Sequence, residues 1–157
     1  MKAPFVVAVL LLAGCGASDD GADDEVTGTV TVLADDSLTD VFTDLGRQLE
    51  DEHPGLTVDL EFGNSAAQAT ELTDGASADV FAAAGLDAMD VVTNDGIVSR
   101  APALFATAPS PDDGTLVGYP ICTLTDAPNP AGALAFVTLV TSDAGQDALR
   151  AAGFAQP

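Results

Sequence analysis

The chain has 157 residues, which is enough for one domain. Apolar residues make up 47% of it and can supply a core, but 25 acidic residues against four basic ones give a formal net charge of −21. This charge excludes nucleic acid as a partner, because no basic patch is available to neutralise phosphates, and it argues against an electrostatic membrane anchor. We interpret most of the acidic residues as a solvated surface.

The first 15 residues have the pattern of a bacterial lipoprotein signal. Lys2 precedes an apolar run, Phe5 to Leu12, that is too short to span a bilayer. The segment Leu12-Ala13-Gly14-Cys15 is similar to the cleavage box after which the cysteine thiol takes a lipid. Acyl chains on Cys15 would hold the mature protein on the outer face of the bacterial cell membrane. The alternative is an ordinary buried cysteine near a cleavage site.

The rest of the chain divides into a tether, residues 16–28, and a single folded lobe, residues 29–157. The tether holds five acidic residues among Gly, Ala and Ser, a composition typical of a self-repelling disordered segment. In the lobe, apolar residues alternate where a strand is expected and recur every three or four positions where a helix is expected. The predicted elements are a strand at 29–33, a helix at 38–49, a strand at 56–62, a helix at 66–72, a strand at 78–83, a helix at 86–94 ended by Gly96, a strand at 115–124, a helix from Pro130 to 140, and a helix to 149 capped by Ser142 or Asp143.

This alternation of strands and helices predicts an α/β fold, with a mostly parallel sheet and helices on both of its faces. Ser37 and Ser65 each follow a predicted strand and precede a predicted helix. An N-cap role would explain either serine alone. However, the carboxyl ends of parallel strands meet at one edge of a sheet. There, serine hydroxyls and helix N-terminal N–H groups can bind an anion without lysine or arginine.

Three blocks of the sequence resemble the molybdate-binding proteins of ABC importers. They are Leu33–Phe42, Phe62–Ala69 and Gly75–Ala82, and the tail from Tyr119 to Phe154 is similar to a lesser degree. The resemblance implies lobe one of a periplasmic-binding-protein type II fold. Carried over residue by residue, it also implies that Ser37 and Ser65 donate hydrogen bonds to molybdate or tungstate. It implies no cofactor and no cation site.

The chain departs from that family in two respects. Family members close two lobes around the anion, but here Phe105 and Thr115 are separated by a short turn-rich segment where the second lobe would be inserted. The two positions before the first serine, commonly small and apolar in the family, are Asp35 and Asp36. We expect at least one of these carboxylates to point into water. We also expect Tyr119 to differ from the tyrosine that contacts the anion in the family.

The resemblance implies an extracytoplasmic solute-binding lipoprotein of a molybdate- or tungstate-type importer, working with the importer's permease and weakened by the missing lobe. The alternative is a lone-lobe surface lipoprotein, an interaction module or deletion product, that no longer binds oxyanion. No enzyme is predicted, because the one histidine, His53, precedes Pro54 at a helix end and completes no triad. If Cys15 carries lipid, Cys122 has no disulfide partner, and we interpret it as a core residue.

Overall fold

The computed structural model describes residues 26–157. The predicted signal with Cys15, and the predicted tether up to residue 25, lie outside the described residues. Within residues 26–157 no helix is both long enough and apolar enough to cross a membrane. Val26 already packs against the core, and the first strand begins at Gly28.

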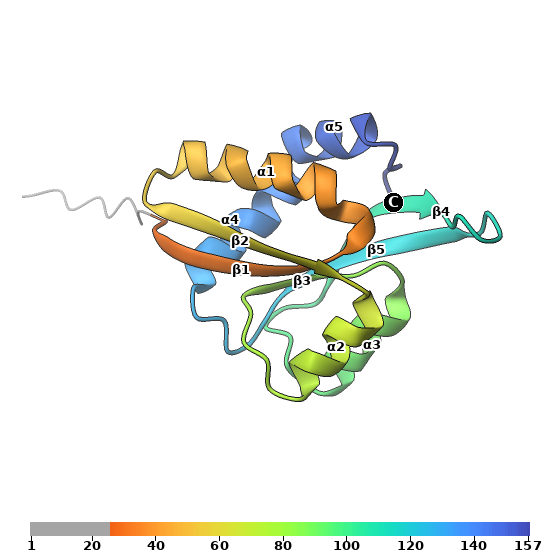
Figure 1. The fold of residues 1–157 in the computed structure, drawn as a ribbon, viewed down its shortest axis with the longest axis horizontal. Helices are drawn as coiled ribbons and strands as arrows, with labels where there is room; N and C mark the ends of the chain where they lie inside the picture. The colour runs from red at the N-terminus through yellow and green to blue at the C-terminus, as the bar shows by residue number, and fades with distance from the viewer. Residues whose placement is uncertain (1–25) are drawn as a thin grey trace, which may run out of the picture.

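One five-stranded sheet organises the described residues, with helices on both faces (Figure 1). The elements are β1 (Gly28–Asp35), the 3-10 turn η1 (Asp36–Leu38), α1 (Thr39–Glu52), β2 (Leu56–Gly63), α2 (Ser65–Thr73), β3 (Val80–Ala82), α3 (Leu86–Asn94), β4 (Ala103–Pro109), β5 (Leu116–Thr123), α4 (Pro130–Thr141) and α5 (Asp143–Ala151). The strand order is β2-β1-β3-β5-β4. Since β1 pairs in parallel with β2 and β3, and β5 is antiparallel to both β3 and β4, only β5 runs against the other four strands. The predicted α/β fold with a mostly parallel sheet is confirmed.

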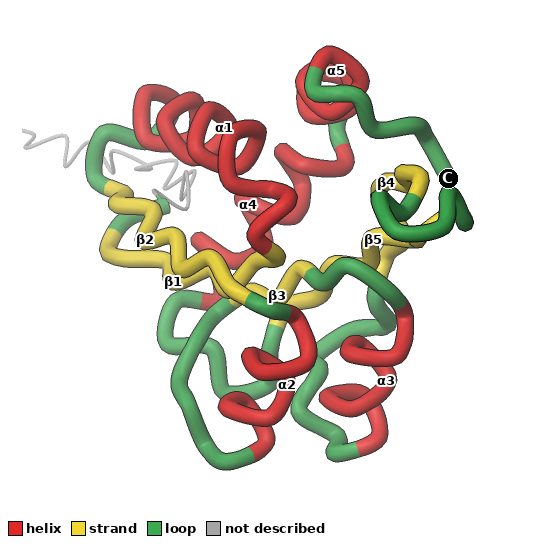
Figure 2. Tube along the Cα trace, turned by 45° about the vertical axis from the view of Figure 1, so that its right-hand side comes forward, coloured by secondary structure: helices red, strands yellow, loops and turns green. Residues whose placement is uncertain are grey.

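Two apolar layers hold the helices against the sheet. On one face, α1, α4 and α5 cover a core in which Phe42 packs against Phe105 and Phe136, with ring centroids 5.8 and 5.3 Å apart. On the other face, α2 and α3 cover a smaller cluster that includes Phe81 and Cys122, and Figure 2 shows these two helices lying below the strands. Cys122 is therefore a core residue, as predicted.

The segment at residues 103–123 forms a β-hairpin at the edge of the sheet. Its second strand, β5, agrees with the predicted strand at 115–124, but β4 is not among the predicted elements. The two strands are joined through a tight turn in which Gly114 has a φ of +73°. Asp113 accepts hydrogen bonds from the backbone N–H and the hydroxyl of Thr115, which lower the pKa of its carboxyl group. A short turn therefore joins β4 to β5 at the position where the resemblance places the insertion of a second lobe.

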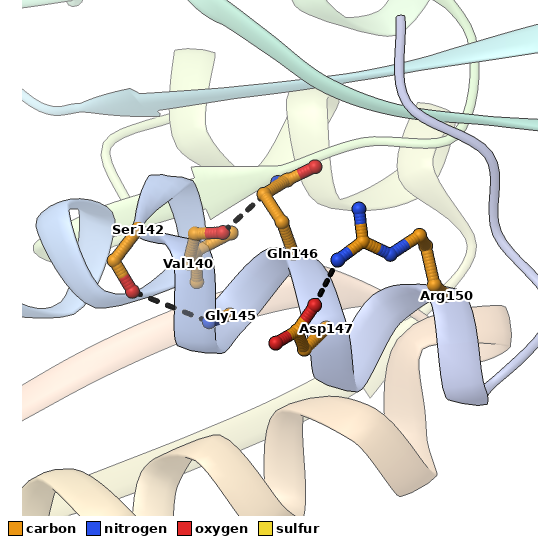
Figure 3. A network of polar contacts seen from close by, with 6 residues as sticks. All are labelled: Val140, Ser142, Gly145, Gln146, Asp147 and Arg150. Atoms are coloured by element: carbon orange, nitrogen blue, oxygen red, sulfur yellow. Dashed lines mark hydrogen bonds and ion pairs between the residues drawn. The ribbon is translucent and has the colours of Figure 1, made fainter.

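Polar contacts at the junction between α4 and α5 order the start of the last helix (Figure 3). Ser142 caps α5, with its Oγ accepting a hydrogen bond of 3.2 Å from the backbone N–H of Gly145. The side-chain amide of Gln146 donates to the carbonyl oxygens of Val140 and Phe105, which links α5 to β4. The predicted start of α4 at Pro130 is confirmed, and of the two caps predicted for the last helix, Ser142 or Asp143, the structure has Ser142.

Candidate functional site at the carboxyl edge of the sheet

Strands β1, β2 and β3 end at the same edge of the sheet, as the register shows. Asp35 lies opposite Gly63, and Ala34 lies opposite Ala82. The reversed strand β5 begins at this edge, so Tyr119, near its start, lies at the edge where the other strands finish. The edge therefore collects residues from the ends of parallel strands together with a tyrosine that comes from the opposite direction.

The carboxylate of Asp35 lies between the two predicted serines. Its Oδ1 accepts hydrogen bonds from the backbone N–H of Ser37, at 3.1 Å, and from the Ser37 hydroxyl, at 2.7 Å. Its Oδ2 accepts a bond of 2.7 Å from the hydroxyl of Ser65. The structure thus brings Ser37 and Ser65 together on one anionic group, and that group belongs to the chain itself.

Two further donors support these hydroxyls from behind. The backbone N–H of Ala84 donates to Ser65 Oγ at 2.9 Å, and the hydroxyl oxygens of Ser37 and Tyr119 lie 3.2 Å apart. A serine hydroxyl has one proton, and that of Ser37 goes to the closer Asp35 oxygen, so Tyr119 is the donor in this longer bond. Every bond in the network consequently points toward the carboxylate, and bonds in such a chain polarise one another.

The negative charge at this edge is held by neutral donors. Two of the chain's arginines make ion pairs on exposed helix surfaces, Arg47 with Asp44 and Arg150 with Asp147. No arginine or lysine among residues 26–157 is hydrogen-bonded to the Asp35 network. The same part of the chain contains no group of three or more His, Cys, Asp or Glu side chains able to hold a metal ion. What the geometry can do chemically is bind an anion through hydroxyl and backbone N–H groups.

The N-cap interpretation of the serines is wrong. Ser37 lies inside η1, whose N-cap is Asp35, and Ser65 is the first residue of α2, whose N-cap is Asn64. The side-chain oxygen of Asn64 accepts bonds of 3.1 Å from the backbone N–H groups of Ala66 and Ala67. Asp and Asn side chains readily bond the backbone two residues on, and here they take the capping position from the serines. Several N–H groups that the sequence left free for a ligand are therefore already paired.

Sequence reasoning missed two members of the site. Asp36 is exposed, so the expectation that one carboxylate points into water is confirmed, but Asp35 is half-buried and turned inward. Tyr119, which we expected to differ from the anion-contacting tyrosine of the family and did not place at the site, contacts Ser37. The spacing of Asp35 and Ser37 was an available signal, because Asp followed two residues later by a backbone donor is a common local turn.

Cys122 carries no nucleophilic chemistry at this edge. It lies 3% exposed in the smaller core, and burial raises the pKa of its thiol to about 12, since the thiolate would be desolvated. His53 occupies the C-cap of α1, where its backbone N–H donates to the carbonyl of Leu49. These surroundings agree with the structural roles expected for both residues.

Comparison with known proteins places the chain in a family. A family model described as bacterial extracellular solute-binding protein matches residues 30–110 and 102–155. The chain belongs to this family. It is homologous to the molybdate-binding protein ModA of Mycobacterium tuberculosis (strain H37Rv), with 38% identity over 109 residues, which are 65% of this chain and 42% of ModA. YvgL of Bacillus subtilis (strain 168), which bears the name of an ABC transporter substrate-binding lipoprotein, is 30% identical over 95 residues, 60% of this chain and 36% of YvgL.

The fold is also that of solved solute-binding proteins. The periplasmic molybdate-binding protein of Azotobacter vinelandii superposes with a TM-score of 0.72 at 10% sequence identity, and the alignment covers 82% of this chain and 99% of that one. At this identity the likeness concerns the fold alone. In sequence, the chain spans less than half the length of the curated relatives that it matches.

Proposed function

We propose that this chain is a solute-binding lipoprotein of a molybdate- or tungstate-type ABC importer, in a shortened form with one lobe, residues 29–157. In this proposal Ser37 and Ser65 donate hydrogen bonds to the oxyanion, and Cys15 carries the lipid that anchors the protein outside the cell membrane. The importer's permease is its partner, and it catalyses no reaction. One observation carries the proposal: two hydroxyls and a backbone N–H converge on a single anionic group, without a cation, at the carboxyl edge of the sheet.

The names of the relatives support an oxyanion of the molybdate type as the solute and a lipid as the anchor. ModA is named for molybdate, and YvgL is named as a lipoprotein. An anion such as molybdate has no need of a basic partner in a site of this kind, because charge-assisted hydrogen bonds from neutral donors stabilise it. Net charge does not forbid binding either, since charges more than about 8 Å away are largely screened at physiological salt.

We expect the affinity to be low. A hydrogen bond to a charged group contributes roughly 1.5–3 kcal/mol, and the edge offers three donors in place of the larger set that two closing lobes supply. The site is also open to water, which weakens each bond. A dissociation constant of about 0.1–1 mM or higher follows from these terms.

A second candidate function is a lone-lobe surface lipoprotein that no longer binds oxyanion. The Asp35 carboxylate favours it, because this group already satisfies both serine hydroxyls. The two candidates share the fold and the anchor, and they differ in whether the edge takes a ligand from solution.

Titration of molybdate into the full chain, isotopically labelled and purified in detergent, distinguishes them. Amide shifts centred on residues 35–39 and 63–67 that are lost in Ser37→Ala and Ser65→Ala would support oxyanion binding. Ser77→Ala is the matched control, because Ser77 is an exposed serine before β3 and outside the Asp35 network. An absence of shifts at about 10 mM molybdate, about ten times the upper end of the 0.1–1 mM range, would favour the second candidate.

A further inference from the structure

We propose that Asp35 sets the affinity of the carboxyl edge for oxyanions, because its carboxylate accepts the hydrogen bonds that an oxyanion would accept and so competes with it. The inference rests on the proposed function, in which Ser37 and Ser65 are the donors to the anion. It concerns the Asp35 carboxylate at the end of β1, a negative charge inside a set of anion-binding donors.

The carboxylate uses the donors that an oxyanion would need. Both serine hydroxyls and the Ser37 N–H are directed at its two oxygens, at 2.7 to 3.1 Å. The supporting donors, the N–H of Ala84 and the hydroxyl of Tyr119, reach the carboxylate only through those serines. A dianion arriving from solution finds every donor of the network already committed.

The backbone holds the carboxylate in this place. Asp35 is the last residue of β1, with φ −62° and ψ 145°, and it is paired in register with Gly63 of β2. The preceding residue, Ala34, is fully buried in the core. Because the side chain is tethered to a rigid strand, its carboxylate competes with a dissolved anion at a high effective concentration.

A dianion must therefore displace the carboxylate or lie beside it, and like charges at such short range repel strongly. If the carboxylate leaves the network in about 1–10% of molecules, the apparent dissociation constant rises by about 10- to 100-fold over that of the empty edge. Removal of the carboxylate should therefore lower the apparent dissociation constant by the same factor.

Equilibrium dialysis with radioactive molybdate, on the full chain in detergent, tests the inference. We expect Asp35→Ala to lower the dissociation constant by about 10- to 100-fold. Asp36→Ala is the matched control, because it removes the same charge from an adjacent, exposed position and should change the constant by less than about threefold. The isosteric Asp35→Asn keeps the shape without the charge, and provides a second variant should Asp35→Ala fail to fold.

The outcomes separate this inference from the proposed function. If Ser65→Ala abolishes the tight binding gained by Asp35→Ala, the inference and the function are both supported. If wild type binds molybdate through its serines but both Asp35 variants bind no better, or Asp36→Ala tightens binding equally, the inference is overturned and the function stands. If the folded Asp35 variants and wild type all fail to bind, both are overturned.

Discussion

Asp79, a carboxylate outside the Asp35 network, provides the sharpest test of how this fold is held together. It lies just before β3, only 1% exposed. Its Oδ2 accepts a bond of 2.7 Å from the backbone N–H of Thr31 in β1, and its Oδ1 accepts one of 2.5 Å from the N–H of Asn129. Asn129 in turn caps α4 by accepting from the N–H of Gly132. Asp79 thus links a central strand to the start of a helix that is distant in sequence.

We expect Asp79→Ala to lower the free energy of unfolding by about 2–6 kcal/mol. The substitution leaves two backbone N–H groups without an acceptor, and each such buried donor costs roughly 1–3 kcal/mol. Natural domains are stable by about 5–15 kcal/mol, so the loss is a large share of the total. Asp79→Asn keeps one carbonyl acceptor in place, and should lose about half as much.

Urea denaturation of the full chain in detergent, followed by circular dichroism, measures the change. Asp126→Ala is the control, because Asp126 is an exposed acid in the loop after β5, and surface substitutions usually stay within about 0.5 kcal/mol. A loss below about 1 kcal/mol for Asp79→Ala, or an equal loss in the control, would refute the claim that this carboxylate fastens β1 to α4.

Three other outcomes are expected. Gly145→Ala should destabilise the fold by several kcal/mol in the same denaturation assay, since an added Cβ would lie 2.2 Å from the carbonyl oxygen of Leu139; unchanged stability would contradict the close approach of α4 and α5. Burial raises the pKa of the Cys122 thiol to about 12 from an ordinary value of 9.0, so its contribution to the free energy of unfolding should be constant below about pH 9 and should disappear between about pH 9 and 12. Cys122→Ala should lack that component, and alkylation of the native thiol near pH 8 that is as fast as alkylation in urea would contradict its burial. Cys15→Ser should leave the protein uncleaved or free in the medium while wild type partitions into detergent, and identical partitioning would exclude lipidation at this position.

The sequence was sufficient for most of the architecture. Within residues 26–157, alternation and helical spacing located four of the strands and all of the α-helices, because each element buries one face or stripe against the sheet. Strand β4 could not be predicted, since Ala103–Pro109 has no clear alternation and ends in proline. It becomes a strand through its long-range pairing with β5, and tertiary context often overrides local preference in this way.

The sequence predicted where the two serines lie, but it did not predict that the Asp35 carboxylate accepts the hydrogen bonds of both serine hydroxyls. Ser37 and Ser65 do lie at one edge of the sheet, because strand order and direction follow from the alternation of elements. The bond from the Ser37 N–H to Asp35 is a local turn that the spacing of these residues could indicate, but the bond from the Ser65 hydroxyl depends on the pairing of β1 with β2 and could not be derived. Tyr119 was missed because only the reversal of β5 brings it to this edge.

The hairpin of β4 and β5 also shows where a fold of this kind can accept or lose an inserted domain during evolution. Its turn lies beyond the register with β3, and Leu116, directly after the turn, is 76% exposed. Chain inserted there leaves every strand pair of the sheet in register, and its closure entropy rises by only about 0.6 kcal/mol for each doubling of loop length. An inserted domain would emerge at the end of the hairpin that extends past β3 on the side of the carboxyl edge. The turn between β4 and β5 is therefore a site where the chain tolerates insertion or deletion of a domain. One insertion there would add a second domain near the serines, and one deletion would remove it, while the strand pairing of the sheet stays the same.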